Sequence, residues 1–275
     1  MRSRRPLTNL ANVLKYLLLT VGAAVMLSPL LFALYTSLEA PSDYMTLVGP
    51  DRLTLQSYEY VITNAPILRW YANTIFVTVC MVLGAVGVNT AAGYALARID
   101  FPGRRPLFLL ILAILMVPLQ AYLIPLYLMV AQLGWLNSYQ ALIVPFIVNP
   151  FLVFLMRQSF QALPKDLEDA AAVDGANRFT TFIRIAVPLT MTGIATQAIL
   201  AGTWTWNSFV IPVTMTTDKD LFVLTVGLNS LQSRFYTLPT IQMAGAILLT
   251  IPVVVMFVAF QRYIVPSLAS TGIRG

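Results

Sequence analysis

The chain has 275 residues, of which 58% are hydrophobic and only 10% are charged, and its mean hydropathy is +0.78. A soluble domain carries about a quarter charged residues, so this composition excludes a soluble globular protein and predicts an integral membrane protein. The net charge of +6 could suggest nucleic-acid binding. The basic residues are distributed as in a membrane protein, however, so no nucleic-acid partner is expected.

Histidine is absent and cysteine occurs once, as Cys80. A single cysteine excludes a disulfide within the chain. Without histidine, neither a metal site nor a histidine-based acid–base mechanism is expected. We therefore assign no catalytic residue and no metal ligand, and we do not expect an enzyme.

The N-terminal part consists of a basic segment at residues 1–5 and an apolar run at 14–38. Signal peptides begin in the same way. The length of the run, the Ser28-Pro29 pair within it and the lack of a clear small-residue cleavage site favour a first spanning helix. Residues 1–38 are thus read as a cytoplasmic N-terminus and a first span. Residues 39–68 are too polar to span and form an extracytoplasmic segment, and residues 69–275 form the core transmembrane domain.

The apolar runs are long and do not alternate, which predicts an all-α membrane protein with six transmembrane helices. The predicted spans are residues 14–38, 69–97, 107–133, 140–160, 189–213 and 239–265. The second span holds small residues suited to close helix packing, namely Gly84, Gly87, Ala91 and Gly93. Pro118 and Pro125 break the third span. Whether the prolines of the spans are kinks that shape a cavity or simple packing features stays open.

The basic residues predict the orientation of these spans. With both termini in the cytoplasm, 13 of the 17 Lys and Arg residues lie on the cytoplasmic side. Such a bias is the usual one for membrane proteins. An odd number of spans would remove it, so six is the better count.

Residues 163–188 form the longest polar interruption in the C-terminal half and are expected in the cytoplasm. Pro164 suits a first helical position, and the acidic residues after it complement the helix dipole. Gly175 stands where this helix should end, and Asn177 can cap a second short helix. The segment therefore predicts a helix–turn–helix for docking a partner protein. The alternative is a solvated loop that only joins two spans.

This segment resembles the EAA loop of the membrane-spanning subunits of bacterial ABC importers. Asp169, Ala170, Ala171, Gly175, Ile185 and Pro188 hold the motif positions at the family's spacing. Asp169 replaces the usual Glu, with Glu168 just before it, and Val187 replaces the usual Leu. The longer form, DLEDAAAVDGA followed by FIRIAVPL, is most similar to the carbohydrate-uptake, maltose-transporter-like branch.

The resemblance implies the type I importer permease fold and a coupling loop at 163–186 that docks on an ATPase subunit. The residues that it implicates in coupling are Glu168, Asp169, Ala170, Ala171, Asp174, Gly175 and Phe179. The implied partners are a second permease subunit, two ATP-binding subunits and an extracytoplasmic solute-binding protein, all in a bacterial cell membrane. The chain has no G-x-x-x-x-G-K-[ST] loop, so ATP and Mg²⁺ are expected on the partner ATPases and no cofactor is expected here.

The implied function is import of a disaccharide or oligosaccharide by alternating access. A glycerol-phosphate or polyol importer is the alternative within the family. A secondary transporter or a membrane enzyme would need titratable groups inside the membrane, and all 11 acids fall in predicted loops or at the edges of spans.

Polar and aromatic residues within the spans are candidates for the substrate path, because sugars bind through ring stacking and amide hydrogen bonds. The principal candidates are Asn149, Gln197, Trp204, Trp206 and Asn207; Asn89 and Gln120 are further ones. For each amide, the alternative is a hydrogen bond to a neighbouring helix, and for each tryptophan it is an interfacial anchor.

Overall fold

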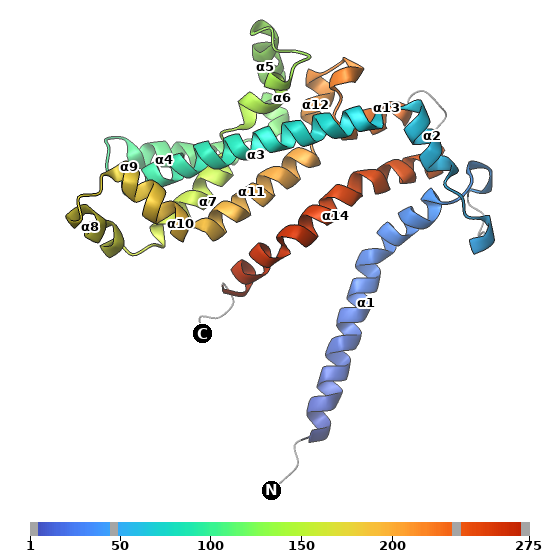
Figure 1. The fold of residues 1–275 in the computed structure, drawn as a ribbon, viewed down its shortest axis with the longest axis horizontal. Helices are drawn as coiled ribbons and strands as arrows, with labels where there is room; N and C mark the ends of the chain where they lie inside the picture. Colours follow the sequence, from blue (N-terminus) through green and yellow to red (C-terminus); the bar gives the residue numbers. More distant parts are fainter. Residues whose placement is uncertain (1–4, 45–48, 233–237, 271–275) are drawn as a thin grey trace. The chain divides into compact units, whose positions relative to one another are not determined.

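The computed structural model describes residues 5–44, 49–232 and 238–270, and over these ranges the chain is helical without a β-strand (Figure 1). The N-terminal elements are α1 (Arg5–Ser37), η1 (Pro41–Asp43), η2 (Pro50–Arg52) and α2 (Gln56–Asn64). The central elements are α3 (Ile67–Arg98), α4 (Arg104–Ile114), α5 (Leu119–Gln132), α6 (Tyr139–Ile143), η3 (Val144–Phe146) and α7 (Pro150–Gln161). The later elements are α8 (Asp166–Val173), α9 (Arg178–Thr181), η4 (Phe182–Ala186), α10 (Val187–Leu189), α11 (Met191–Trp206), α12 (Val210–Met215), η5 (Lys219–Leu221), α13 (Leu224–Gln232) and α14 (Pro239–Ser270).

In the described part of the chain, two helical stretches, Asn12–Ser37 and Ile67–Arg98, are long and apolar enough to cross a membrane. Three helix pairs meet that test only when joined across a bend: 102° between α4 and α5, 42° between Tyr139–Phe146 and α7, and 77° between Arg178–Leu189 and α11. Pro118 is the N-cap of α5 and therefore lies at the sharpest bend, whereas Pro125 lies inside α5 without ending it. Of the two prolines expected to break the third predicted span, only Pro118 does so.

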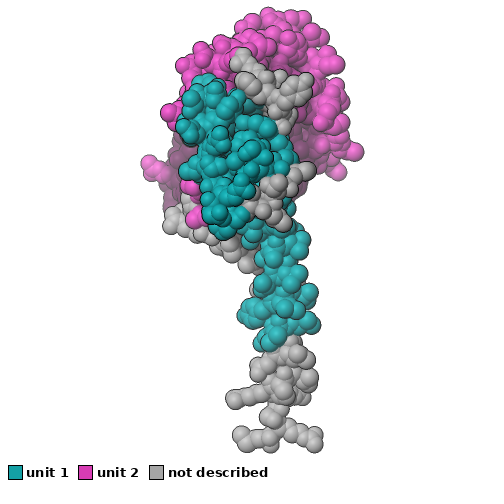
Figure 2. Space-filling model, turned by 90° about the vertical axis from the view of Figure 1, so that its right-hand side faces the viewer, with its two compact units in different colours: residues 1–66, 228–251 teal, residues 67–227, 252–275 magenta. Residues whose placement is uncertain are grey.

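The chain forms two compact units, residues 1–66 with 228–251, and residues 67–227 with 252–275 (Figure 2). In the first unit, the end of α1 is tied to the segment that follows it. The hydroxyls of Ser37 and Tyr58 lie 2.7 Å apart, and the Thr54 amide donates to the Leu38 carbonyl at 2.7 Å. These bonds satisfy polar groups where the apolar helix ends.

The second unit is built around α3, against which α7 and α11 pack along their lengths (Figure 1). The Asn89 amide donates to the Ile147 carbonyl at 2.9 Å and accepts from the Asn149 amide at 2.9 Å. From α11, Gln197 donates to the Ala85 carbonyl at 2.7 Å. Between helices surrounded by lipid, burial of apolar side chains gives little driving force for association, so hydrogen bonds of this kind help to hold the helices together.

Two of the four small residues of α3 make the close approaches expected of them. A Cβ added at Gly93 would lie 2.6 Å from the Met156 Cβ and 2.8 Å from the Arg157 nitrogen, and one at Gly84 would lie 3.0 Å from the Ile147 side chain. Gly87 faces open space and Ala91 is exposed, so neither brings two helices together among the described residues.

Polar groups also fix the first turns of α3 to a later loop of the same unit. Asn73 donates to the Asp220 and Phe222 carbonyls at 2.8 and 2.9 Å, and the Trp70 indole donates to the Lys219 carbonyl at 3.1 Å. These carbonyls belong to the short 3-10 helix η5 and the residue after it, and the side chains of α3 hold this segment in place by donating to them.

Candidate functional site

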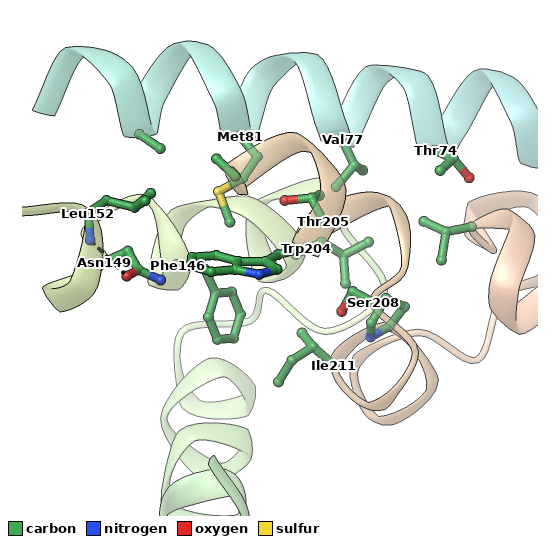
Figure 3. Close-up of a pocket in the computed structure, with 15 residues that line it drawn as sticks. Thr74, Val77, Met81, Phe146, Asn149, Leu152, Trp204, Thr205, Ser208 and Ile211 are labelled. Atoms are coloured by element: carbon green, nitrogen blue, oxygen red, sulfur yellow. Dashed lines mark hydrogen bonds between the residues drawn. The ribbon is translucent and has the colours of Figure 1, made fainter. Parts of the chain in front are cut away.

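The second unit contains an aromatic-lined cavity of about 170 Å³ between α3, η3, α7, α11 and α12 (Figure 3). Trp204 of α11 lies at its centre in the figure, with Phe146 of η3 beneath the indole and Met81 of α3 above it. The hydroxyls of Thr205 and Ser208 also line the cavity. An apolar ring beside a few hydroxyls is a surface on which a sugar ring can stack while its own hydroxyls are hydrogen-bonded.

Two of the five principal substrate-path candidates line this cavity. Trp204 is 45% exposed and meets Phe151 edge-on, with ring centroids 5.8 Å apart. Asn149 lines the wall, but its side-chain oxygen accepts from the Phe151 and Leu152 amides at 3.0 and 3.3 Å and thus caps α7. The same asparagine therefore has a structural role at the cavity wall.

The other three candidates lie elsewhere. Gln197 is fully buried, and its side-chain amide donates a hydrogen bond to α3. Its role is therefore the interhelical hydrogen bond named above as the alternative to a substrate contact. Trp206 is 4% exposed and packs near Tyr71, with ring centroids 6.4 Å apart. Asn207 is exposed and donates to the Thr203 carbonyl of its own helix at 2.8 Å. None of the three is among the cavity-lining residues.

Residues that the sequence argument did not single out complete the cavity. Ala201, Trp204, Thr205 and Ser208 all line it, at the i, i+3, i+4, i+7 spacing of one helical face. Counted from Trp204, this spacing identifies Ser208, four residues further on; Thr205 fits it only when the count starts at Ala201. Met81 and Phe146 come from other elements, and nothing local marks them.

The second candidate region is the hairpin of α8 and α9 at the C-terminal end of α3 (Figure 1). Helix α8 begins at Asp166 with Lys165 as N-cap, so Pro164 lies before the helix and not at its first position as expected. Asp166, Glu168 and Asp169 do lie in the first turn, as predicted. Their carboxylates complement the positive end of the helix.

Gly175 ends α8 in the manner predicted, with a φ of +82°. The Gly175 amide donates to the Ala172 carbonyl at 3.1 Å and the Ala176 amide to the Ala171 carbonyl at 2.9 Å. This pair of bonds is the Schellman motif, which requires the left-handed conformation that glycine adopts without strain. The turn of the hairpin is therefore built around this one residue.

Asn177 caps α9, because its side-chain oxygen accepts from the Thr180 amide at 2.8 Å. The chain then makes a π-helical turn, η4, before Pro188. Pro188 has no N–H to donate to the Arg184 carbonyl, so the regular bonding pattern cannot continue there. A bend of 77° follows between α10 and α11.

The coupling candidates differ in exposure. Asp169, Ala170, Asp174 and Gly175 are exposed, Phe179 is 73% exposed, and Ala171 is 6% exposed. Glu168 faces inward and forms an ion pair with Arg98, with Nε and Oε1 3.2 Å apart. Val173, at the end of α8 and absent from the candidates, is 88% exposed. The tip of the hairpin thus exposes two apolar side chains, Val173 and Phe179, to solvent, which is typical of an interaction surface.

Comparison with known proteins decides the family. The family described as "Binding-protein-dependent transport system inner membrane component" matches residues 89–270. The chain belongs to this family. The match includes the hairpin, three helices that line the cavity (α7, α11 and α12), and the C-terminal part of α3 from Asn89 onward.

Relatives cover the permease over nearly its whole length. It is 35% identical to the arabinooligosaccharides transport system permease protein AraQ of Halalkalibacterium halodurans, over 94% of this chain and 96% of that one. It is 32% identical to the trehalose/maltose transport system permease protein MalG of Thermococcus litoralis, over 96% and 99%. A crystal structure of a bacterial ABC transporter involved in alginate import has the same fold, with a TM-score of 0.81 at 23% identity over 96% of this chain and 99% of that chain. The predicted importer permease fold is confirmed.

Proposed function

We propose that this permease is a membrane-spanning subunit of an ATP-driven importer of a disaccharide or oligosaccharide. The observation that carries the proposal is the full-length similarity to permeases named for arabinooligosaccharide and for trehalose/maltose transport. The cavity supports it, because Trp204 beside Thr205 and Ser208 offers a stacking ring and hydroxyls and no charged group for an ionic substrate.

A second permease subunit closes the path. The cavity volume of about 170 Å³ is below the roughly 300–1,000 Å³ of pockets that bury a small ligand. The side of Trp204 that is exposed in this chain alone is available to a partner subunit. A solute-binding protein delivers the substrate from outside; the words "binding-protein-dependent transport" in the family description support this part of the proposal.

Two ATPase subunits supply the energy, and they hold the ATP and Mg²⁺, since this chain has no phosphate-binding loop. The hairpin is the docking element. Its exposed tip, with Val173 and Phe179 beside the carboxylates of Asp169 and Asp174, combines an apolar contact with polar groups at its rim. Closure of the ATPases moves the docked hairpins, and the helices of the permease rock between inward- and outward-facing states.

Six spans with both termini in the cytoplasm complete the proposal. The long helices α1 and α3, the three bent pairs and the apolar stretch Pro239–Val255 of α14 offer that number of crossings. The excess of basic residues on one side of this arrangement favours the cytoplasmic placement of the hairpin.

Reporter fusions test this topology. A reporter joined after Pro102 should lie in the cytoplasm, and a reporter joined after Gly134 should lie outside, because one bent span separates the two sites. Alkaline phosphatase and green fluorescent protein fusions measured in parallel give opposite patterns at the two sites. The same pattern at both sites would contradict the six-span arrangement.

Affinity purification in mild detergent from the native cell tests the function. We expect an ATPase subunit and a second permease to co-purify, and the binding protein to join when a sugar ligand and ATP are supplied. A chain that purifies alone from cells growing on its substrate would count against an ATP-driven importer.

A further inference from the structure

The end of α3 is attached to the hairpin through one buried guanidinium. Arg98 is the last residue of α3 and its side chain is 5% exposed. Its Nη2 donates to the Phe160 carbonyl at 2.7 Å and to the Leu163 carbonyl at 2.5 Å, and its Nε pairs with Glu168 of α8 at 3.2 Å. One side chain thus connects α3, the end of α7 and the first helix of the hairpin.

Each of these contacts places groups of opposite charge or partial charge next to each other. The last carbonyls of α7 and α3 carry the negative end of a helix dipole, where a cation is stabilised. Glu168 lies in the first turn of α8, where a carboxylate is stabilised. Arg98 thus donates hydrogen bonds to two carbonyls and lies in ion-pair contact with one carboxylate, and removal of Glu168 would leave a buried guanidinium without its counter-charge.

Aromatic packing shields the contact from water. Tyr94, one turn before Arg98, meets Phe160 at 5.3 Å between ring centroids and Phe182 at 4.8 Å. These rings belong to a buried cluster with Met156 and Ala186. An ion pair in such low-dielectric surroundings holds its partners in one arrangement more strongly than an exposed one.

Helix α3 runs from this contact to the cavity wall without a break. Ala85 and Met81 line the cavity, and Ala85 lies 13 residues before Arg98, which is about 20 Å along a helix axis. A displacement of α8 that is passed to Arg98 therefore reaches the cavity through one rigid element.

We propose that Arg98 and Glu168 are positioning residues: their ion pair fixes the hairpin to α3, so that movement of the hairpin moves the wall of the cavity. This inference rests on the proposed function of the hairpin as the ATPase docking element. It gives Glu168 an internal role, distinct from the exposed carboxylates of Asp169 and Asp174 on the same hairpin.

The variant that tests the pair is Glu168→Gln, with Asp166→Asn as its matched control. Both changes remove one carboxylate from the first turn of α8, but Asp166 is exposed and forms no ion pair among the described residues. In the whole transporter reconstituted in liposomes, Glu168→Gln should lower the sugar transported per ATP hydrolysed by about fivefold, within the range of coupling changes that single residues produce. Asp166→Asn should leave the ratio unchanged.

A distance measurement separates this inference from the proposed function. Spin labels at Leu167 on α8 and Leu83 on α3, both exposed and neither part of the exposed tip that docks the ATPase, report the position of α8 on α3 in the purified complex after Cys80→Ser. One narrow distance is expected for the otherwise unchanged protein and for Asp166→Asn, and a broad distribution for Glu168→Gln. If the complex moves no sugar, the proposed function fails, but the distances still decide whether the pair positions the hairpin. A narrow distribution in Glu168→Gln, or a broad one with unchanged coupling in an active transporter, would overturn the inference.

Discussion

Valine in place of Gly175 is expected to lower sugar uptake about tenfold while the transporter still assembles and hydrolyses ATP. The φ of +82° at this position costs a non-glycine residue with a branched side chain about 1–2 kcal/mol, which shifts the population of the native turn by a factor of about 5–30. Apart from the adjacent residues of the chain, no atom of the described residues lies within 4 Å of a Cβ placed there, so the effect comes from the backbone and not from a clash. The measurement is uptake and ATP hydrolysis in parallel in liposomes.

Two matched variants isolate the role of the hairpin. Gly134→Val imposes the same kind of strain, because Gly134 has a φ of +70°, ends α5 with the same pair of hydrogen bonds and also faces open space. It should leave coupling intact. Gly175→Asn should retain most of the uptake, since asparagine tolerates the left-handed region. Equal loss of uptake in Gly134→Val and Gly175→Val would show general destabilisation and refute a docking role for this turn.

Alanine in place of Trp204 is expected to lower the rate of sugar uptake about tenfold, which corresponds to about 1.4 kcal/mol of lost interaction with the substrate in the path. The indole lies in the centre of the cavity and is 45% exposed, so its removal takes away a stacking surface without opening the core (Figure 3). Thermal stability of the purified complex should stay within a few degrees of the parent protein, as for most exposed positions.

Conservative replacements at the same helix serve as controls. Trp204→Phe keeps an aromatic face and should restore most of the uptake. Trp206→Phe, two residues further along and buried outside the cavity, should alter stability and leave the sugar concentration for half-maximal uptake unchanged. If Trp204→Ala transports normally, Trp204 is not part of the sugar path.

The hairpin could be predicted in detail because its signals are local. The carboxylates of the first turn, Gly175 at the helix end and the Asn177 cap each act within a few residues of the chain, and the structure has each of them. What could not be predicted is the direction of Glu168. Its partner Arg98 is 70 residues away in sequence, and only the packing of α3 against α7 brings them together.

The cavity shows the same limit. Trp204 and Gln197 lie seven residues apart on one helix and were equally good candidates, yet one lines the cavity and the other bonds α3. Periodicity does not distinguish the two cases, because residues seven apart share one face of α11; they differ in that α11 bonds α3 at Gln197 and borders the cavity two turns later at Trp204. Likewise, Pro118 indicated a break, but the 102° bend depends on how the two flanking helices pack.

The decisive measurement is uptake of a labelled oligosaccharide by liposomes that hold this permease with its co-purified subunits and binding protein. We predict an ATP-driven importer, with uptake only when ATP and Mg²⁺ are on the side of the ATPases and no uptake with a non-hydrolysable ATP analogue. Uptake that continues without ATP and follows an ion gradient would contradict it and identify a secondary carrier instead.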